Sequence, residues 1–266
     1  NLAIRGNRRL DELHPYVDMQ LSSGLRFHAV IPPLAIAGTA ISIRVPAATN
    51  LTLSDLQAMG FMNSTMHSIL VQIIDSQKSF LISGGTGSGK TTLLAAMLSM
   101  VDPTHRILVI EDAAELNVVH PHLVRVQSRL ANSEGLGQVT MTDLVRQSLR
   151  MRPDRIIIGE VRGREISDLL LALNTGHNGS ATTIHANNVY TVPSRIEALG
   201  LLSGLPREAI HTQMITAFEY VIQLSDFQDT KRSIASIAKL TPDSNGFAEI
   251  EVLVDSTITH PMHLAA

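Results

Sequence analysis

A glycine-rich run set between a strand pattern and a helix pattern constrains this chain more than any other feature. Residues 84–91 read Gly-Gly-Thr-Gly-Ser-Gly-Lys-Thr, which satisfies G-x-x-x-x-G-K-[ST], and they follow the apolar run Phe80–Ser83. Glycines let successive backbone N–H groups approach phosphate oxygens, and the helix that follows adds partial positive charge at its N-terminus. Lys90 is expected to reach the β- and γ-phosphates, and the Thr91 hydroxyl to bind Mg²⁺. The run therefore predicts a nucleotide-binding loop.

From residue 78 onward, short apolar runs alternate with amphipathic ones. This alternation is typical of an α/β fold, with a mainly parallel sheet covered on both faces. The segment 234–254 has the character of a hairpin that turns at residues 243–246. The expected strands are 80–83, 107–110, 155–158, 181–185 and 221–224, and the expected helices are 91–100, 143–151, 165–174, 193–202 and 207–218.

The first 76 residues have a different pattern. Residues 29–45 are expected to form two strands joined by a turn, and 46–52 is the best candidate for a linker. Helices are expected from Ser54 and over 64–75. We therefore predict part of a smaller N-terminal α+β domain over 1–50, a linker with helices over 51–76, and the nucleotide-binding domain over 77–266. Because Asn1 opens inside what reads as folded sequence, we expect a further N-terminal part to precede it.

Two of the expected strands lead into acidic residues. The first is followed by Glu111, Asp112 and Glu115, and the second by Gly159 and Glu160, with Gly159 standing where a Walker B element usually has Asp. The carboxyl ends of parallel strands line the ligand crevice of an open sheet, so both acids are expected beside the glycine-rich loop. Such acids orient water or hold Mg²⁺ during hydrolysis, but they also cap helices, and both interpretations remain open at this point.

Two histidines flank the expected strand over 181–185. A neutral imidazole can donate to a γ-phosphate or sense it, so we expect His185 at the site and place His177 among the residues that contact nucleotide. The nine other histidines show no ligand spacing, and the chain has no cysteine, so a protein metal site is not predicted.

Charge and composition exclude several classes of protein. A net charge of −3 and an aromatic content of 3% do not favour nucleic acid as a partner, since that needs a basic face or stacking platforms. Neither a secretory signal nor an apolar run long enough to span a bilayer is predicted. The cations are lopsided, with seventeen Arg against four Lys, and eight of the Arg lie between Arg125 and Arg164.

Four segments, taken together and in this order, resemble the type II/IV secretion ATPase superfamily, with most likeness to the tight-adherence (CpaF-like) pilus ATPases. They look like the Walker A, Asp box, Walker B and His box of that superfamily, in which a Gly-Glu pair like that at 159–160 is the usual form of Walker B. The resemblance covers most of the chain and weakens after about residue 226. It is carried by residues 84–92, 110–116, 149–163 and 174–187, with support from 30–34 and 41–44.

This resemblance implies a RecA-like motor domain that works as a homo-hexameric ring, with ATP and Mg²⁺ bound at the cleft between the two domains. Glu111 is the first choice for water activation and Glu115 the alternative, since Ala113 replaces the superfamily's usual Pro between them. Glu160 is implied on the Mg²⁺ side through water, together with Thr91. The nucleotide-contacting set is Gly84, Gly85, Thr86, Gly87, Ser88, Gly89, Lys90, Thr91, Thr92, Arg44, Arg162 and His177, and the catalytic set is Glu111, Glu115, Glu160 and His185.

The implied activity is ATP hydrolysis coupled to pilus assembly or protein secretion across the bacterial cell envelope. The implied location is the cytoplasm, attached to the inner membrane through platform proteins of the machine. Arg150, Arg152 and Arg162 are candidates for phosphate or inter-subunit contacts. Two other hypotheses remain: a RecA-like nucleic-acid translocase, and an ATP-gated ring scaffold that does not hydrolyse.

Overall fold

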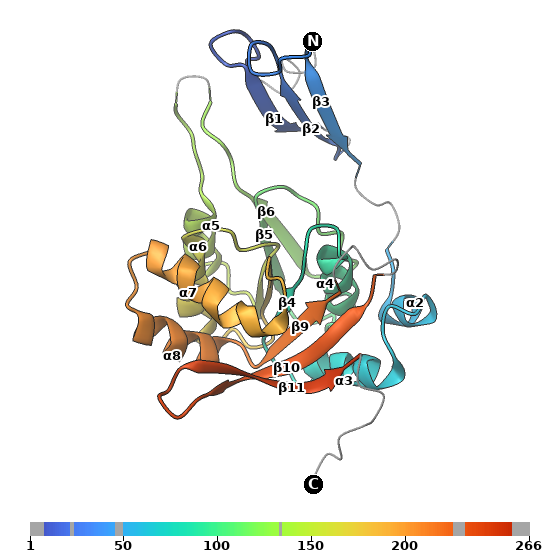
Figure 1. Cartoon of the computed structure of the whole chain (residues 1–266). Coiled ribbons are helices and arrows are strands. Elements are labelled where there is room, and N and C mark those ends of the chain that lie inside the picture. Colours follow the sequence, from blue (N-terminus) through green and yellow to red (C-terminus); the bar gives the residue numbers. More distant parts are fainter. Residues whose placement is uncertain (1–7, 22–23, 46–49, 133–134, 226–231, 257–266) are drawn as a thin grey trace.

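The computed structural model describes residues 8–21, 24–45, 50–132, 135–225 and 232–256, and they form two sheets of very different size (Figure 1). The smaller sheet is antiparallel throughout, and its middle strand is β2. Its strands are β1 (Tyr16–Gln20), β2 (Arg26–Val30) and β3 (Ala40–Arg44).

The larger sheet has eight strands in the order β11-β10-β9-β4-β8-β7-β5-β6. All neighbours from β9 to β6 run parallel, and β10 and β11 add an antiparallel hairpin beyond β9. The expected mainly parallel sheet is therefore confirmed. Its strands are β4 (Phe80–Ser83), β5 (Ile107–Glu111), β6 (Leu123–Gln127), β7 (Arg155–Ile158), β8 (Ala181–Ile184), β9 (Tyr220–Leu224), β10 (Ile234–Pro242) and β11 (Ala248–Asp255).

Helices cover both faces of the larger sheet, and the strands read as continuous apolar runs for that reason. One face carries α2 (Leu53–Ala58), α3 (Ser64–Asp75) and α4 (Lys90–Leu98). The other carries α5 (Met141–Ser148), α6 (Glu165–Leu173), α7 (Val192–Leu202) and α8 (Arg207–Ala217), with a short 3₁₀ turn, η1 (Val189–Thr191), before α7. Strand residues alternate between these two layers: Phe80 and Ile82 face the first, and Leu81 faces the second.

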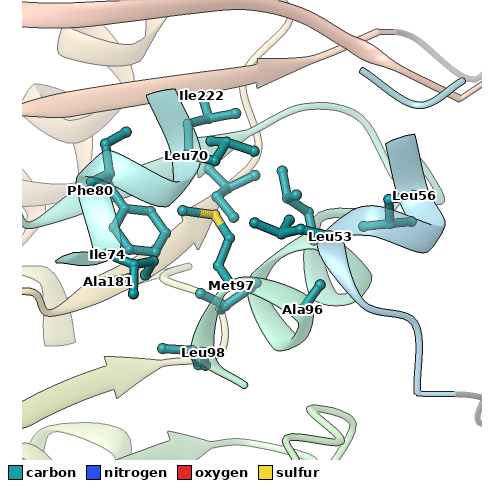
Figure 2. Close-up of a cluster of buried hydrophobic side chains, with 14 of the residues drawn as sticks. Leu53, Leu56, Leu70, Ile74, Phe80, Ala96, Met97, Leu98, Ala181 and Ile222 are labelled. Atoms are coloured by element: carbon teal, nitrogen blue, oxygen red, sulfur yellow. The ribbon is translucent and has the colours of Figure 1, made fainter. Parts of the chain in front are cut away.

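Figure 2 shows the first layer, where β4 and α4 are held. Leu70 and Ile74 of α3 pack with Phe80 of β4 and Met97 of α4, and all four side chains are at most 2% exposed. Burial of this kind leaves neither the strand before residue 84 nor the helix after residue 89 free to shift. The glycine-rich loop therefore connects two elements, β4 and α4, that the same core holds in place.

Side-chain caps decide where the helices before this core begin. Thr52 and Asp55 form a capping box, so α2 begins at Leu53, one residue before the expected start. Asn63 accepts a hydrogen bond from the backbone N–H of Met66 and caps α3, which spans the expected range.

The expected strands and helices of the larger sheet are confirmed with small shifts at their ends, and the expected hairpin turn joins β10 to β11. Two strands were missed, β1 and β6, because each is a five-residue edge strand with a mixed polar pattern. The two strands expected over 29–45 are β2 and β3, with β2 beginning earlier, at Arg26. Of the expected linker, residues 46–49 lie outside the described residues, and the domain boundaries stay a prediction.

None of the helices in the described part of the chain combines the length and the apolar character needed to cross a membrane.

Leu70 tests whether this core determines stability. Its side chain is fully buried between α3 and its neighbours. We expect Leu70→Ala to lower the free energy of unfolding by about 2–5 kcal/mol, measured by urea denaturation. The matched control is Leu171→Ala on α6, where the side chain is 58% exposed and the cost should stay near 0.5 kcal/mol. Equal costs at the two positions would contradict this assignment of the core.

Candidate nucleotide and active site

The glycine-rich loop has the backbone that its glycines predict. Gly89 sits just before α4 in the left-handed region (φ 103°), and no side chain caps the helix there. The N–H groups of the first turn of α4 therefore suit an anion, with the helix dipole behind them. Gly84 combines a positive φ of 152° with a lack of space, because a Cβ there would lie 2.9 Å from Ser88 Oγ and 3.1 Å from Leu224 Cβ.

Lys90 is folded beneath this loop. Its Nζ donates hydrogen bonds to the carbonyl oxygens of Gly84, at 2.8 Å, and Gly85, at 2.7 Å. The side chain is buried, and this burial lowers the pKa of the ammonium, while the Glu160 carboxylate opposes the shift. A cation held mainly by neutral carbonyl dipoles interacts strongly with a phosphate that reaches the loop.

A cleft of about 350 Å³ opens above the loop, between the larger and the smaller sheet. Most of the residues expected from sequence line it. Gly84 and Gly85 do not line it, but their carbonyl oxygens accept hydrogen bonds from Lys90, which does. The expected residues that line it are Arg44, Thr86, Gly87, Ser88, Gly89, Lys90, Thr91, Thr92, Glu115, Glu160, Arg162 and His185.

Strand order explains why residues so distant in sequence meet here. β4 pairs with β8 so that Ser83 lies beside Ile184, which places His185 next to the start of the loop. β7 lies on the other side of β8, and Glu160 follows it. The carboxyl ends of parallel strands share one edge, as the sequence predicted.

Glu160 lies at the centre of a charged group. Its Oε2 accepts a hydrogen bond from Arg162 at 2.6 Å, and its Oε1 lies 2.7 Å from His185 Nε2. Arg162 also reaches the Asp112 carboxylate at 3.2 Å. His185 Nδ1 lies 3.5 Å from Lys90 Nζ, so a neutral ring accepts there and carries its proton on Nε2. Burial first, and Lys90 second, lower the pKa of His185, which favours this neutral ring.

Mg²⁺ is implied by the chemistry of the loop, and the residues fit it. Thr91, in the first turn of α4, and Glu160 both line the cleft. Glu160 Oε1 is buried without an aligned hydrogen-bond partner among the described residues. Such an oxygen, in a cleft that Thr91 also lines, suits a hard cation or a water molecule in its shell.

The two acids of the Asp box have different surroundings. Glu115 faces the cleft and pairs with two arginines of the smaller sheet: Arg44 at 2.8 Å and Arg26 at 3.6 Å. Glu111 is 4% exposed and touches only a smaller hollow beside the cleft. Its Oε1 accepts from two backbone N–H groups and its Oε2 from Arg125. Burial raises the pKa of Glu111, and these donors oppose that shift.

The single chain brings neither His177 nor most of the arginines of residues 125–164 into the cleft. His177 is not among the residues lining the cleft, and its Nδ1 lies 3.0 Å from the Ala172 carbonyl oxygen at the end of α6. Of the eight arginines between Arg125 and Arg164, only Arg162 lines the cleft. The others have structural contacts: Arg146, for example, pairs with Asp168, and Arg155 is buried against backbone carbonyls. Arg150 bonds its own helix, and Arg152 has a left-handed backbone (φ 50°) outside the cleft lining.

Sequence reasoning missed Arg26 and Gln20, which also line the cleft. Arg26 lies opposite Arg44 in the β2–β3 ladder, so pairing these two strands in sequence could have found it. Gln20 donates to the Ala114 carbonyl at 3.3 Å and accepts from Gln127 at 3.0 Å, which joins the smaller sheet to the Asp box. No local motif marks that contact.

Comparison with known proteins gives a consistent picture. The model of the family described as type II/IV secretion system protein matches residues 3–242. A candidate conjugal transfer protein of Mycobacterium tuberculosis strain H37Rv is 49% identical over 245 residues, covering 90% of this chain and 70% of that protein. The type IV secretion system protein VirB11 of Bartonella henselae is 30% identical over 264 residues, covering 84% and 73%.

Among solved structures, the VirB11 ATPase of the Brucella suis type IV secretion system, in complex with sulphate, is similar with a TM-score of 0.59. Its sequence is 26% identical, and the match covers 89% of this chain and 77% of that one. The α/β arrangement with a small N-terminal unit is thus shared with a named ATPase.

His185 makes stability depend on pH in a defined direction. Because folding lowers the pKa of this imidazole, the unfolded chain takes up the proton more readily, and stability is lost as the pH falls through the ordinary value of about 6.5. We expect His185→Gln to lose less stability than the wild type between roughly pH 7.5 and roughly pH 5.5, measured by urea unfolding. Equal losses in the two proteins would contradict the assigned environment.

Proposed function

The chain belongs to the type II/IV secretion system protein family and is an ATPase of that family; from this premise we propose that it is a ring-forming motor that powers the passage of a macromolecule through the bacterial cell envelope. One observation carries the proposal. A phosphate loop with a buried lysine lies in one cleft with carboxylates of two strand ends and with arginines of a separate sheet.

Binding of ATP follows from the loop. Its N–H groups and Lys90 hold the β- and γ-phosphates, and the ammonium exchanges the carbonyls of Gly84 and Gly85 for phosphate oxygens. Thr91 and, through water, Glu160 would hold Mg²⁺, which when bound neutralises charge on the phosphates. We assign neutral His185 the role of sensing the γ-phosphate, because its Nε2 lies beside Glu160 and its Nδ1 beside Lys90.

We assign the water-orienting carboxylate to Glu115, in place of the first choice made from sequence, Glu111. Glu115 lines the cleft, and the guanidinium groups of Arg44 and Arg26 beside it hold its carboxylate in position. Glu111 has both oxygens engaged by protein donors and is nearly inaccessible. A carboxylate that must accept a proton from water needs one free oxygen at the reaction site.

The arginines of the smaller sheet give hydrolysis a route to mechanical work. Arg44 and Arg26 pair with Glu115 across the cleft, and a triphosphate competes for the same guanidinium groups with a higher charge. Exchange of partners on binding and after hydrolysis would move the smaller sheet relative to the larger one. In a ring, six such movements act on one substrate.

We further propose that the ring is a homo-hexamer in the cytoplasm, attached to the inner membrane through platform proteins of the machine. The proposed branch is tight adherence, which rests on the Asp-box and Walker B segments and on the absence of a four-cysteine module. His177 and the exposed Arg150 and Arg152 are then available to a neighbouring subunit.

A nucleic-acid translocase is the second candidate, because the Mycobacterium tuberculosis relative carries a conjugal-transfer name. The net charge of −3 speaks against direct DNA binding by this chain. Stimulation of ATP turnover by DNA that disappears with rising salt would favour that candidate. Tight ATP binding without phosphate release would instead favour a non-hydrolysing scaffold.

Lys90 provides the primary test of enzymatic function. We expect Lys90→Ala to reduce steady-state ATP hydrolysis at least about 100-fold, measured by phosphate release, because the charge facing the transferred phosphoryl group is removed. The matched control is Lys78→Ala, which removes a surface ion pair with Glu219 and should leave turnover unchanged. Wild-type turnover in Lys90→Ala would overturn the proposal.

The ring is tested by mass. We expect light scattering with Mg²⁺ and a non-hydrolysable ATP analogue to give the mass of six chains of 28.8 kDa, since nucleotide at a two-domain cleft orders the surfaces that meet in a ring. The same measurement without nucleotide is the control. A single-chain mass under both conditions would contradict ring formation by this chain.

A further inference from the structure

Glu111 is a buried carboxylate whose hydrogen bonds shape the Asp box. Its Oε1 accepts from the backbone N–H groups of Glu115, at 2.9 Å, and Leu116, at 2.7 Å. These two hydrogen bonds fold the chain that follows β5 into a loop, and residues 115 and 116 of this loop lie beside the end of β5. As a result, the Glu115 side chain leaves this loop on the side of the cleft.

Gly159 leaves the space that Glu111 occupies. A Cβ at residue 159 would lie 2.9 Å from Glu111 Cγ and 3.4 Å from its Oε1. The backbone of Gly159 is not in the left-handed region, so the requirement for glycine is steric. Hydrogen bonds hold it in place, from Gly159 N to the Ile110 carbonyl and from Thr183 Oγ1 to the Gly159 carbonyl. The Asp usual in a Walker B element would collide here.

Arg125 completes the environment of Glu111. It extends from β6, which pairs with β5, and its guanidinium donates to Glu111 Oε2 at 3.1 Å. A buried carboxylate without such a partner is costly, because burial favours its neutral form. The other charged groups that line the hollow around Glu111 are Asp112, Glu115, Glu160 and Arg162.

We propose that Glu111 is a positioning residue that presents Glu115 to the nucleotide, and that Gly159 and Arg125 are the two features that hold Glu111 in place. The proposal rests on the proposed function, in which Glu115 orients the attacking water. It gives a reason for the Gly-Glu form of this Walker B segment: residue 159 has no side chain because Glu111 of the neighbouring strand, β5, occupies that space. It also takes Arg125 out of the group of cations that face phosphate.

The two glutamates are separated by paired amide substitutions. In Glu111→Gln the amide oxygen still accepts from both backbone N–H groups, so we expect kcat to stay within about tenfold of the wild type. In Glu115→Gln the group that accepts a proton from water is gone, and we expect a loss of at least about 100-fold. The readout is ATP turnover with KM. A loss in Glu111→Gln equal to that in Glu115→Gln would overturn the proposal.

Gly159→Ala tests the steric part. The added methyl group displaces Glu111, and we expect kcat to fall about tenfold or more with KM for ATP little changed, since the phosphate loop is untouched. In a Glu111→Ala background the same substitution should add little further loss. The control for general destabilisation is Gly200→Ala, whose Cβ would lie 2.7 Å from Ile210 in the packing of α7 on α8 and should leave kcat of the folded protein unchanged.

Arg125 tests the electrostatic part. Because Arg125 donates to Oε2 of the buried Glu111 carboxylate and is its ionic partner, Arg125→Gln should leave the Glu111 side chain free to move, and we expect kcat to fall about tenfold with KM for ATP little changed. Arg125→Lys should restore part of kcat. Arg146→Gln removes a comparable ion pair with Asp168, remote from the site, and should change nothing. A wild-type kcat in Arg125→Gln would overturn this part of the proposal.

These variants distinguish a wrong positioning role for Glu111 from a wrong water-orienting role for Glu115. If Glu115→Gln is inactive while Gly159→Ala and Arg125→Gln behave as wild type, the proposed function stands and the positioning inference is wrong. If Glu115→Gln turns over ATP normally, the assignment of Glu115 under the proposed function is wrong, and the positioning inference falls with it.

Discussion

The edge shared by four parallel strands is the constraint on which this site depends. β5, β7, β8 and β4 lie side by side in that order, so their carboxyl ends bring Glu111, Glu160, His185 and the phosphate loop together. The strands are apolar on both faces because helices cover both faces, and this burial supplies most of the free energy that holds the edge in register. A polar site is thus built at the ends of strands whose side chains are mostly apolar.

The contact between the smaller sheet and the larger domain is of the opposite kind. Among the described residues, ion pairs and hydrogen bonds cross it, such as Arg44 with Glu115 and Gln20 with the Ala114 carbonyl. Contacts of this kind between partly exposed groups contribute little stability in water, and a ligand with a higher charge can exchange them. The core keeps the phosphate loop fixed, whereas this polar contact contributes little to holding the smaller sheet, which is what the proposed motor function requires.

Sequence alone predicted the parts of the site that a local pattern encodes. The phosphate loop, Glu160 and His185 each follow an apolar strand, and the strand fixes where each side chain begins. Arg26 was missed because its place depends on the register of β2 with β3, which no local pattern reports. The clustering of arginines suggested phosphate contacts, yet three-dimensional neighbours assign Arg125 and Arg146 to carboxylates. Position along the chain does not reveal which charge an arginine meets.

The choice between Glu111 and Glu115 shows the same limit of local sequence patterns, and its physical cause. Both stand in one short segment with the same chemistry, and the sequence placed Glu111 first because it directly follows a strand. That place is also the most buried one, and the spacing of four and five residues lets its Oε1 meet the N–H groups of Glu115 and Leu116. An oxygen that already accepts two hydrogen bonds in a desolvated position has little capacity left for water. The carboxylate nearer the strand therefore accepts the hydrogen bonds of the loop, and the one that the loop carries outward lines the cleft.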